Sequence, residues 1–105
     1  RQVLPASAVR EMERDQTEGA RILYSPHRAY GLIDPRYGIG VWRDRVAADG
    51  RALQVSSQGA FGFSPWLDRE RGVAAVLVVR DELSRVYAAV FDLQRVLREV
   101  IDAGR

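Results

Sequence analysis

The residues of this chain that could take part in chemistry are few, and their types restrict the reactions open to it. All sixteen basic residues are arginines, and the 105 residues include no lysine, asparagine or cysteine. A catalytic lysine, a thiolate nucleophile and a disulfide are therefore excluded within this sequence. The single histidine, His27, argues against a self-contained zinc site, because such a site needs several nitrogen or sulfur ligands. We expect no metal and no cofactor.

One polar segment, Ser56 to Gly62, combines small polar side chains with glycines in a way that would suit a substrate-binding strand. Ser57 and Gln58 are followed at once by Gly59 and Ala60. Two interpretations stay open for this segment. Its side chains could bind a substrate, or they could form a polar strand face that meets water, with glycines that mark a bulge.

Other residues whose side chains could take part in chemistry are better explained by structural roles. His27 lies in a loop without a visible partner, and we expect it at the surface with no assigned role. Aromatic residues on strands usually pack in the core, which is our expectation for Trp42, Phe61, Phe63 and Trp66. Four arginines surround the possible site and could bind a substrate carboxylate, although solvated surface residues are the better interpretation: Arg21, Arg28, Arg36 and Arg43.

The elements that must position these residues begin with a helix and a long loop. Ala6, Val9 and Met12 recur every three positions, which predicts a short helix over about residues 5–17. Residues 19–36 contain Pro26 and Pro35 and read as an irregular, packed loop. Loops of this length inside compact domains are often functional, so this loop is a candidate rim for a binding site.

The rest of the sequence predicts strands and a closing helix. Alternating apolar residues and the turn pair Asp49-Gly50 indicate a hairpin, and further apolar runs follow. We expect Pro65 at a bulge or an unpaired position. A stripe of apolar residues at three- and four-residue spacing predicts a helix over 83–103, capped by Asp81 or Ser84. The expected strands cover about 37–45, 52–59, 60–68 and 73–80. The fold class is α+β, an antiparallel β-meander of three to four strands flanked by an N-terminal helix and a long C-terminal helix.

The apolar strand Val73 to Val79 leads to an expectation about partners. It is apolar on both alternating faces, so both faces should be covered, yet only one long helix is available. We therefore expect another polypeptide on the other face, either the N-terminal part of a longer parent chain or a second copy. The chain also begins without an initiating Met, which suits a part-domain of a larger protein.

Charge and hydropathy exclude two classes of partner. The formal net charge of +2 arises from sixteen arginines and fourteen acidic residues scattered along the chain, with no one-sided basic patch. Nucleic-acid binding is therefore not expected. The longest apolar run is far too short to span a bilayer, so no membrane segment is expected either.

Several segments resemble, in their order and spacing, the last third of the β-lactamase-related serine hydrolases, a family that includes class C β-lactamases, DD-peptidases and esterases. The segments are Tyr37-Gly38-Ile39-Gly40-Val41-Trp42, Ser57-Gln58-Gly59-Ala60-Phe61-Gly62, Trp66-Leu67-Asp68 and Arg71-Gly72. The resemblance covers nearly all of the chain. It implies a part of a β-lactamase/transpeptidase-like fold and a parent protein that hydrolyses an ester, amide or β-lactam through an acyl-enzyme.

The resemblance also implies roles for particular residues. The family's catalytic Ser-x-x-Lys and Tyr motifs precede the matched region, so no catalytic residue is expected in this chain. The third motif, Lys-Thr-Gly or His-x-Gly, matches Ser57, Gln58 and Gly59, where Gly59 leaves room for the substrate backbone. The N–H of Ala60 would then form the oxyanion hole together with the N–H of the absent serine. Ser57 stands where a Lys or His is usual, which removes a fixed charge and favours an esterase or amidase over a β-lactamase.

Two rival interpretations remain. A helix, a meander and a second helix also describe several non-catalytic interaction or dimerisation modules, which would explain the missing nucleophile. The chain could also belong to a pseudo-enzyme of the same family. A Ser-x-x-Lys motif followed by a Tyr motif upstream would decide for the enzyme.

Overall fold

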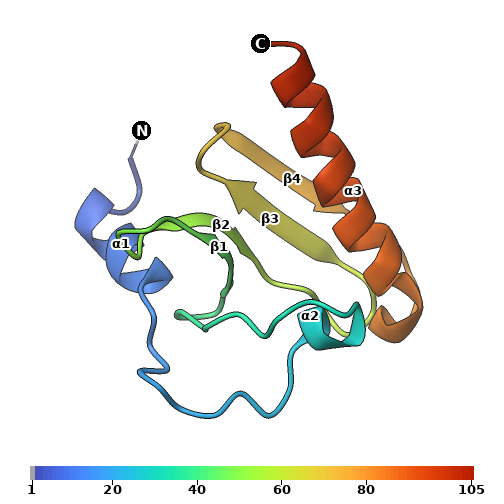
Figure 1. Ribbon diagram of the computed structural model, residues 1–105, viewed down its shortest axis with the longest axis horizontal. Helices are drawn as coiled ribbons and strands as arrows, with labels where there is room; N and C mark the ends of the chain where they lie inside the picture. Colours follow the sequence, from blue (N-terminus) through green and yellow to red (C-terminus); the bar gives the residue numbers. More distant parts are fainter. Residues whose placement is uncertain (1) are drawn as a thin grey trace.

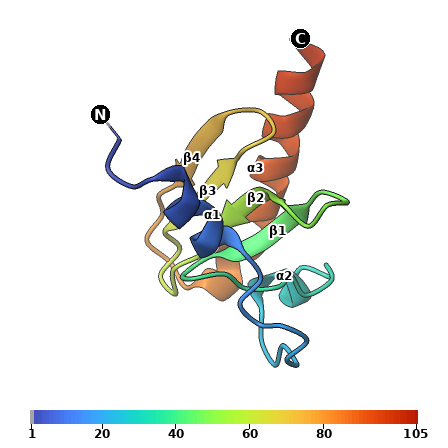
Figure 2. The ribbon, with the colours of Figure 1, turned by 90° about the vertical axis from the view of Figure 1, so that its left-hand side faces the viewer.

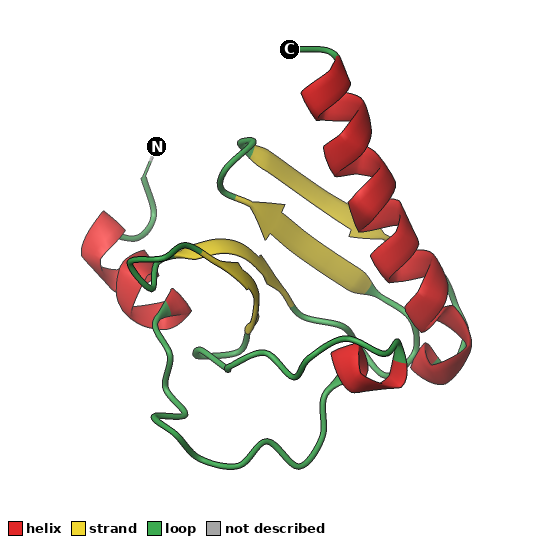
Figure 3. Ribbon diagram, in the orientation of Figure 1, coloured by secondary structure: helices red, strands yellow, loops and turns green. Residues whose placement is uncertain are grey.

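Four strands form one antiparallel sheet whose spatial order is the order of the sequence (Figures 1 and 3). The structure is a computed structural model that describes residues 2–105. Every neighbouring pair of strands is antiparallel, as the meander prediction requires. The strands are β1 (Trp42–Val46), β2 (Ala52–Ser56), β3 (Ser64–Asp68) and β4 (Val73–Leu77).

The predicted hairpin at Asp49-Gly50 is confirmed. The N–H of Ala47 donates to the carbonyl of Arg51 at 2.9 Å, and this bond closes the turn between β1 and β2. Gly50 has a φ of 86°, a left-handed conformation that glycine adopts without steric cost. The turn fixes the register that places Trp42 opposite Ser56.

All four strands are shorter than predicted. Residues 37–41 form a turn before β1, closed by a bond of 2.8 Å from the N–H of Gly38 to the carbonyl of Val41. Residues 57–63 lie outside any strand, so the predicted strand 52–59 ends too late and the predicted strand 60–68 begins too early. β4 ends at Leu77 rather than near residue 80. Pro65 lies opposite Val76 in β3, just beyond the last residue pair between β2 and β3.

Helix α3 (Leu83–Ala103) covers one face of the sheet and has the predicted bounds. It packs Val90 and Phe91 against the face that carries Trp66, which is 4 % exposed. Neither predicted cap forms, because the N-cap residue is Glu82 and no side chain caps the helix. The buried apolar core consists of Ala52, Val55, Trp66, Leu83, Val90 and Phe91.

Helix α1 (Ala6–Glu13) lies on the opposite side of the sheet from α3 (Figure 2). It ends at Glu13 rather than near residue 17, and none of its residues is buried. Arg43, predicted at the surface, is buried beneath it and donates from Nε to the carbonyl of Glu13 at 2.8 Å. This contact satisfies a carbonyl at the end of α1, which explains why a charged strand residue is buried there.

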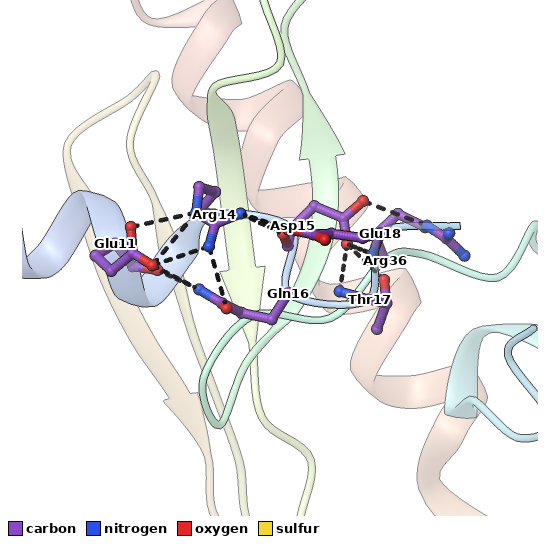
Figure 4. A network of polar contacts seen from close by, with 7 residues as sticks. All are labelled: Glu11, Arg14, Asp15, Gln16, Thr17, Glu18 and Arg36. Carbon is purple, nitrogen blue, oxygen red and sulfur yellow. Dashed lines mark hydrogen bonds and ion pairs between the residues drawn. The ribbon is translucent and has the colours of Figure 1, made fainter. Parts of the chain in front are cut away.

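A polar network holds the segment after α1 against the segment that precedes β1 (Figure 4). The Asp15 carboxylate accepts from the N–H of Thr17 at 2.8 Å, and its second oxygen accepts from Nε of Arg36 at 3.4 Å. The N–H of Gln16 donates to the carbonyl of Tyr37 at 2.9 Å. Hydrogen bonds to the charged form, chiefly from the Thr17 hydroxyl, lower the pKa of Asp15 to about 2.

The long loop contains one short helix, α2 (Pro26–Ala29), which the sequence did not predict. The Ser25 hydroxyl accepts from the N–H of Arg28 at 3.2 Å and caps this turn. Pro26 occupies the first helical position, where its missing N–H costs nothing. The turn places His27 against Phe91 of α3 and Asp44 of β1.

The sheet face opposite α3 is bare over β3 and β4. Along β4, half-buried residues alternate with exposed ones. Val76 is 46 % exposed and Val78 is 68 % exposed, so apolar side chains meet solvent on this face. Among residues 2–105, no helix is long and apolar enough to cross a membrane.

Candidate functional site

The predicted site residues lie where β2 runs past the end of β1. The β1–β2 ladder ends at the pair Trp42 and Ser56, while residues after Ser56 still bond to the β3 side. The N–H of Ser57 donates to the carbonyl of Pro65 at 3.1 Å, and that of Gly59 donates to the carbonyl of Phe63 at 2.7 Å. In extended backbone, successive residues direct their N–H groups to opposite edges. The segment after Ser56 therefore has one paired edge and one open edge.

Ala60 is held firmly through its carbonyl, which accepts from the N–H of Leu83 at 2.8 Å. Ala60 itself is exposed, and its N–H donates to no atom of residues 2–105. The N–H of Leu83 thus holds the peptide between Ala60 and Phe61. The preceding peptide, which carries the Ala60 N–H, is held by the bond from the N–H of Gly62 to the carbonyl of Gly59. A donor of this kind can stabilise a developing oxyanion without reorganisation.

Gly59 and Gly62 close a tight turn rather than a bulge in a strand. The N–H of Gly62 donates to the carbonyl of Gly59 at 3.0 Å. Gly62 has a φ of 96°, and a Cβ there would lie 2.5 Å from Cγ2 of Val79. Any other residue at position 62 would therefore be strained and would clash with the chain that leads into α3.

The side chains of Ser57 and Gln58 are not brought together. Ser57 is exposed, whereas Gln58 is half-buried and donates from Nε2 to the Ser56 hydroxyl at 2.7 Å. The open edge is therefore formed mainly by backbone, with Ser57 as its exposed side chain. The assignment of Ser57, Gln58, Gly59 and Ala60 as substrate-binding residues stays a prediction.

A buried polar cluster under α3 was missed by the sequence analysis. His27 was expected at the surface, but it is 3 % exposed, and its Nε2 lies 2.6 Å from Oδ1 of Asp44. The Ser56 hydroxyl donates to the same carboxylate oxygen at 2.8 Å. Because Ser56 bonds to Asp44 and not to His27, this group is not a nucleophile–base pair.

Three further residues extend the cluster along α3. Gln54 donates from Nε2 to Oδ2 of Asp44 at 3.2 Å and to Oε1 of Gln94 at 3.0 Å. Arg98 donates from Nη1 to Oε1 of Gln54 at 2.9 Å. The alternation of Gln54 and Ser56 with apolar residues in β2 was a usable signal, because it placed two polar side chains on one face of a central strand.

Two of the four aromatic residues contradict the expectation that all pack in the core. Phe61 is 77 % exposed and Phe63 is 53 % exposed, because both lie in the turn after β2. Trp66 is buried, and Trp42 is half-buried with its ring 4.7 Å from that of Tyr37. The exposed phenylalanines therefore lie in the turn and not in the core. Among the described residues 2–105, no three or more His, Asp or Glu side chains gather as a metal site would require.

Comparison with solved structures finds a likeness over most of this chain. The chain is similar to the crystal structure of a protein from Bacteroides dorei DSM 17855 described as a "putative beta-lactamase", with 28% identity and a TM-score of 0.62. The match supports a β-lactamase-like fold. It covers 88% of this chain and 33% of that protein, so this chain spans about a third of its neighbour's length. No protein-family model and no curated protein match the sequence.

Proposed function

We propose that this chain forms one wall of the active site of a serine hydrolase that cleaves an ester, amide or β-lactam through an acyl-enzyme. The observation that carries the proposal is the N–H of the exposed Ala60, which donates to no atom of residues 2–105 and belongs to a peptide whose carbonyl, that of Gly59, accepts from the N–H of Gly62. The likeness to a putative β-lactamase supports the same chemistry. In this proposal the Ala60 N–H stabilises the oxyanion, and Gly59 gives the acyl group close access to the backbone.

The nucleophile and its base would come from outside this sequence, in a Ser-x-x-Lys motif and a Tyr motif. The 105 residues contain no lysine, and the buried Ser56 bonds to a carboxylate rather than to a base. A direct test compares the full-length parent protein with this chain, using a chromogenic β-lactam and a short-chain nitrophenyl ester. Turnover by the parent and none above buffer by the chain is the expected result. Turnover by the chain alone would contradict the proposal.

The substrate preference follows from Ser57. Its neutral, exposed side chain offers no fixed charge for a substrate carboxylate. We therefore expect the parent to prefer neutral esters or amides over anionic β-lactams. Values of kcat/KM for the two substrate classes on the parent protein test this, and a clear preference for the anionic substrates would count against it.

The bare sheet face suggests that another polypeptide binds there. Val76 and Val78 expose apolar surface beside the unpaired edge of β4, and such a surface favours association. Another polypeptide, either the N-terminal part of the parent or a second copy of the chain, would cover it. Size-exclusion chromatography with light scattering on the 105-residue chain should show a self-associated species rather than a monomer. A monomer that unfolds cooperatively would favour the non-catalytic interaction module instead.

A further inference from the structure

A cavity of about 250 Å³ lies between α3, β1 and α2, under the helix and away from the open strand edge. Its lining combines the polar cluster described above with the apolar side chains of Leu32 and Phe91. Three of its lining residues carry buried polar atoms without a hydrogen-bond partner: His27 Nδ1, Arg45 Nη1 and Gln94 Nε2. Buried polar atoms are nearly always paired, so these three are groups that a molecule bound in the cavity can satisfy.

The direction of the hydrogen bonds in the cluster determines whether the amide nitrogen or the amide oxygen of Gln94 is left without a partner. A carboxylate can only accept, so the group of Gln54 that contacts Asp44 must be its amide nitrogen. That nitrogen also donates to Gln94, which must therefore present its oxygen to Gln54. The Gln94 nitrogen remains as a donor on a side chain that is only 3 % exposed.

Two guanidinium groups add positive charge to the same cavity. Arg45 uses Nη2 in an ion pair with Glu70 at 2.9 Å, and its Nη1 is buried without a partner. Arg98 is half-buried, contacts Gln54 and forms no ion pair with any residue in the range 2–105. Burial lowers the pKa of Arg98, and the charge of Arg45 acts in the same direction.

The carboxylate that lines the cavity, that of Asp44, already has hydrogen-bond partners within the protein. Asp44 accepts hydrogen bonds from Ser56 and Gln54, and its Oδ1 lies within hydrogen-bond distance of His27 Nε2. The groups left for a ligand are thus mainly donors next to an apolar wall. This combination suits an anionic oxygen group attached to a small apolar body.

We propose that this cavity binds a small organic carboxylate, whose oxygens accept hydrogen bonds from Gln94 Nε2, Arg45 Nη1 and the Arg98 guanidinium. The apolar part of the ligand packs against Phe91 and Leu32. The site is separate from the proposed hydrolytic site, and it stands or falls independently of it.

The test uses benzoate and its neutral analogue benzamide, titrated into the 105-residue protein by calorimetry in a buffer free of carboxylates and phosphate. Benzoate should bind at one site with a Kd of roughly millimolar order, as suits a ligand of this size. Benzamide should bind about tenfold more weakly or not at all, because it lacks the charge that strengthens the hydrogen bonds. Equal binding of the two ligands, or no saturable benzoate binding, would overturn the proposal.

Matched variants locate the site. Arg98→Met should weaken benzoate binding about tenfold or more, whereas Arg85→Met removes the same charge from an exposed position on α3 and should leave the Kd unchanged. Because Arg98→Met could disturb folding, the side-chain amide signal of Gln94 in NMR spectra of the unmodified protein gives a second readout. It should shift with benzoate, and an unmoved signal or a folded Arg98→Met protein of unchanged affinity would contradict the assignment.

Discussion

Gln54 and Gln94 join the central strand β2 to helix α3 through a hydrogen bond of 3.0 Å between buried amides. Gln54 also contacts Asp44 and Arg98, so its single side chain connects an acidic and a basic residue on different elements. The interface between the sheet and its covering helix is thus polar at its centre. Such a network specifies how α3 sits on the sheet, and each member depends on the others.

Replacing Gln54 should be costly because it leaves several buried groups without partners. We expect Gln54→Leu to lower the free energy of unfolding by about 2–4 kcal/mol. Gln94→Leu should cost less, since it removes only one partner of Gln54. Urea denaturation of both variants and of the double variant tests this. The double variant should cost less than the sum of the two, and simple additivity would show that the amides do not act as one unit.

Arg71 should be the most important arginine for stability. Its guanidinium pairs with the buried Asp68 at 3.1 Å and with Asp102 at the end of α3 at 2.7 Å. We expect Arg71→Met to lower the free energy of unfolding clearly, because it leaves Asp68 buried without its charged partner. Arg95→Met is the matched control. Its ion pair with Glu99 is exposed, so Arg95→Met should lower the free energy of unfolding much less than Arg71→Met does.

Acid should destabilise the protein in part through Asp15. Its pKa is lowered from 3.8 to about 2 in the folded state, so the folded protein binds the proton less readily than the unfolded chain. The stabilisation is therefore fully present above the unfolded pKa, and it is lost as the pH falls towards about 2. Thermal unfolding of Asp15→Asn and the unmodified protein should differ at pH 6 and converge near pH 2. A difference that does not change with pH would contradict this role.

The sequence predicted the parts of this fold that depend on local pattern. The apolar stripe of α3 and the turn pair Asp49-Gly50 were sufficient because helix periodicity and turn conformation depend on neighbouring residues. The same approach failed at Phe61 and Phe63. Their aromatic character indicated a strand, but the flanking Gly59 and Gly62 close a turn instead.

The buried cluster could not be predicted because its bonds join distant segments. His27 was assigned to the surface since no partner lies near it in the sequence, and Asp44 reaches it only through the packing of α2 against the sheet edge. Arg43 was misassigned for the same reason, because its acceptor is a backbone carbonyl of α1. For Ser57 to Ala60, the family resemblance indicated the residues, while the free N–H of Ala60 became visible only in three dimensions.

The most direct test of the proposed function removes the Ala60 N–H from the full-length parent protein. Position 60 follows Gly59 in a tight turn, a place where proline is well tolerated, so Ala60→Pro deletes the donor with little change to the backbone. Ala60→Ser keeps the N–H and is the control. We predict that Ala60→Pro lowers kcat for a nitrophenyl ester by about a hundredfold or more while Ala60→Ser stays near the unmodified rate. A folded Ala60→Pro protein with unchanged kcat would contradict the assignment of this strand to the active site.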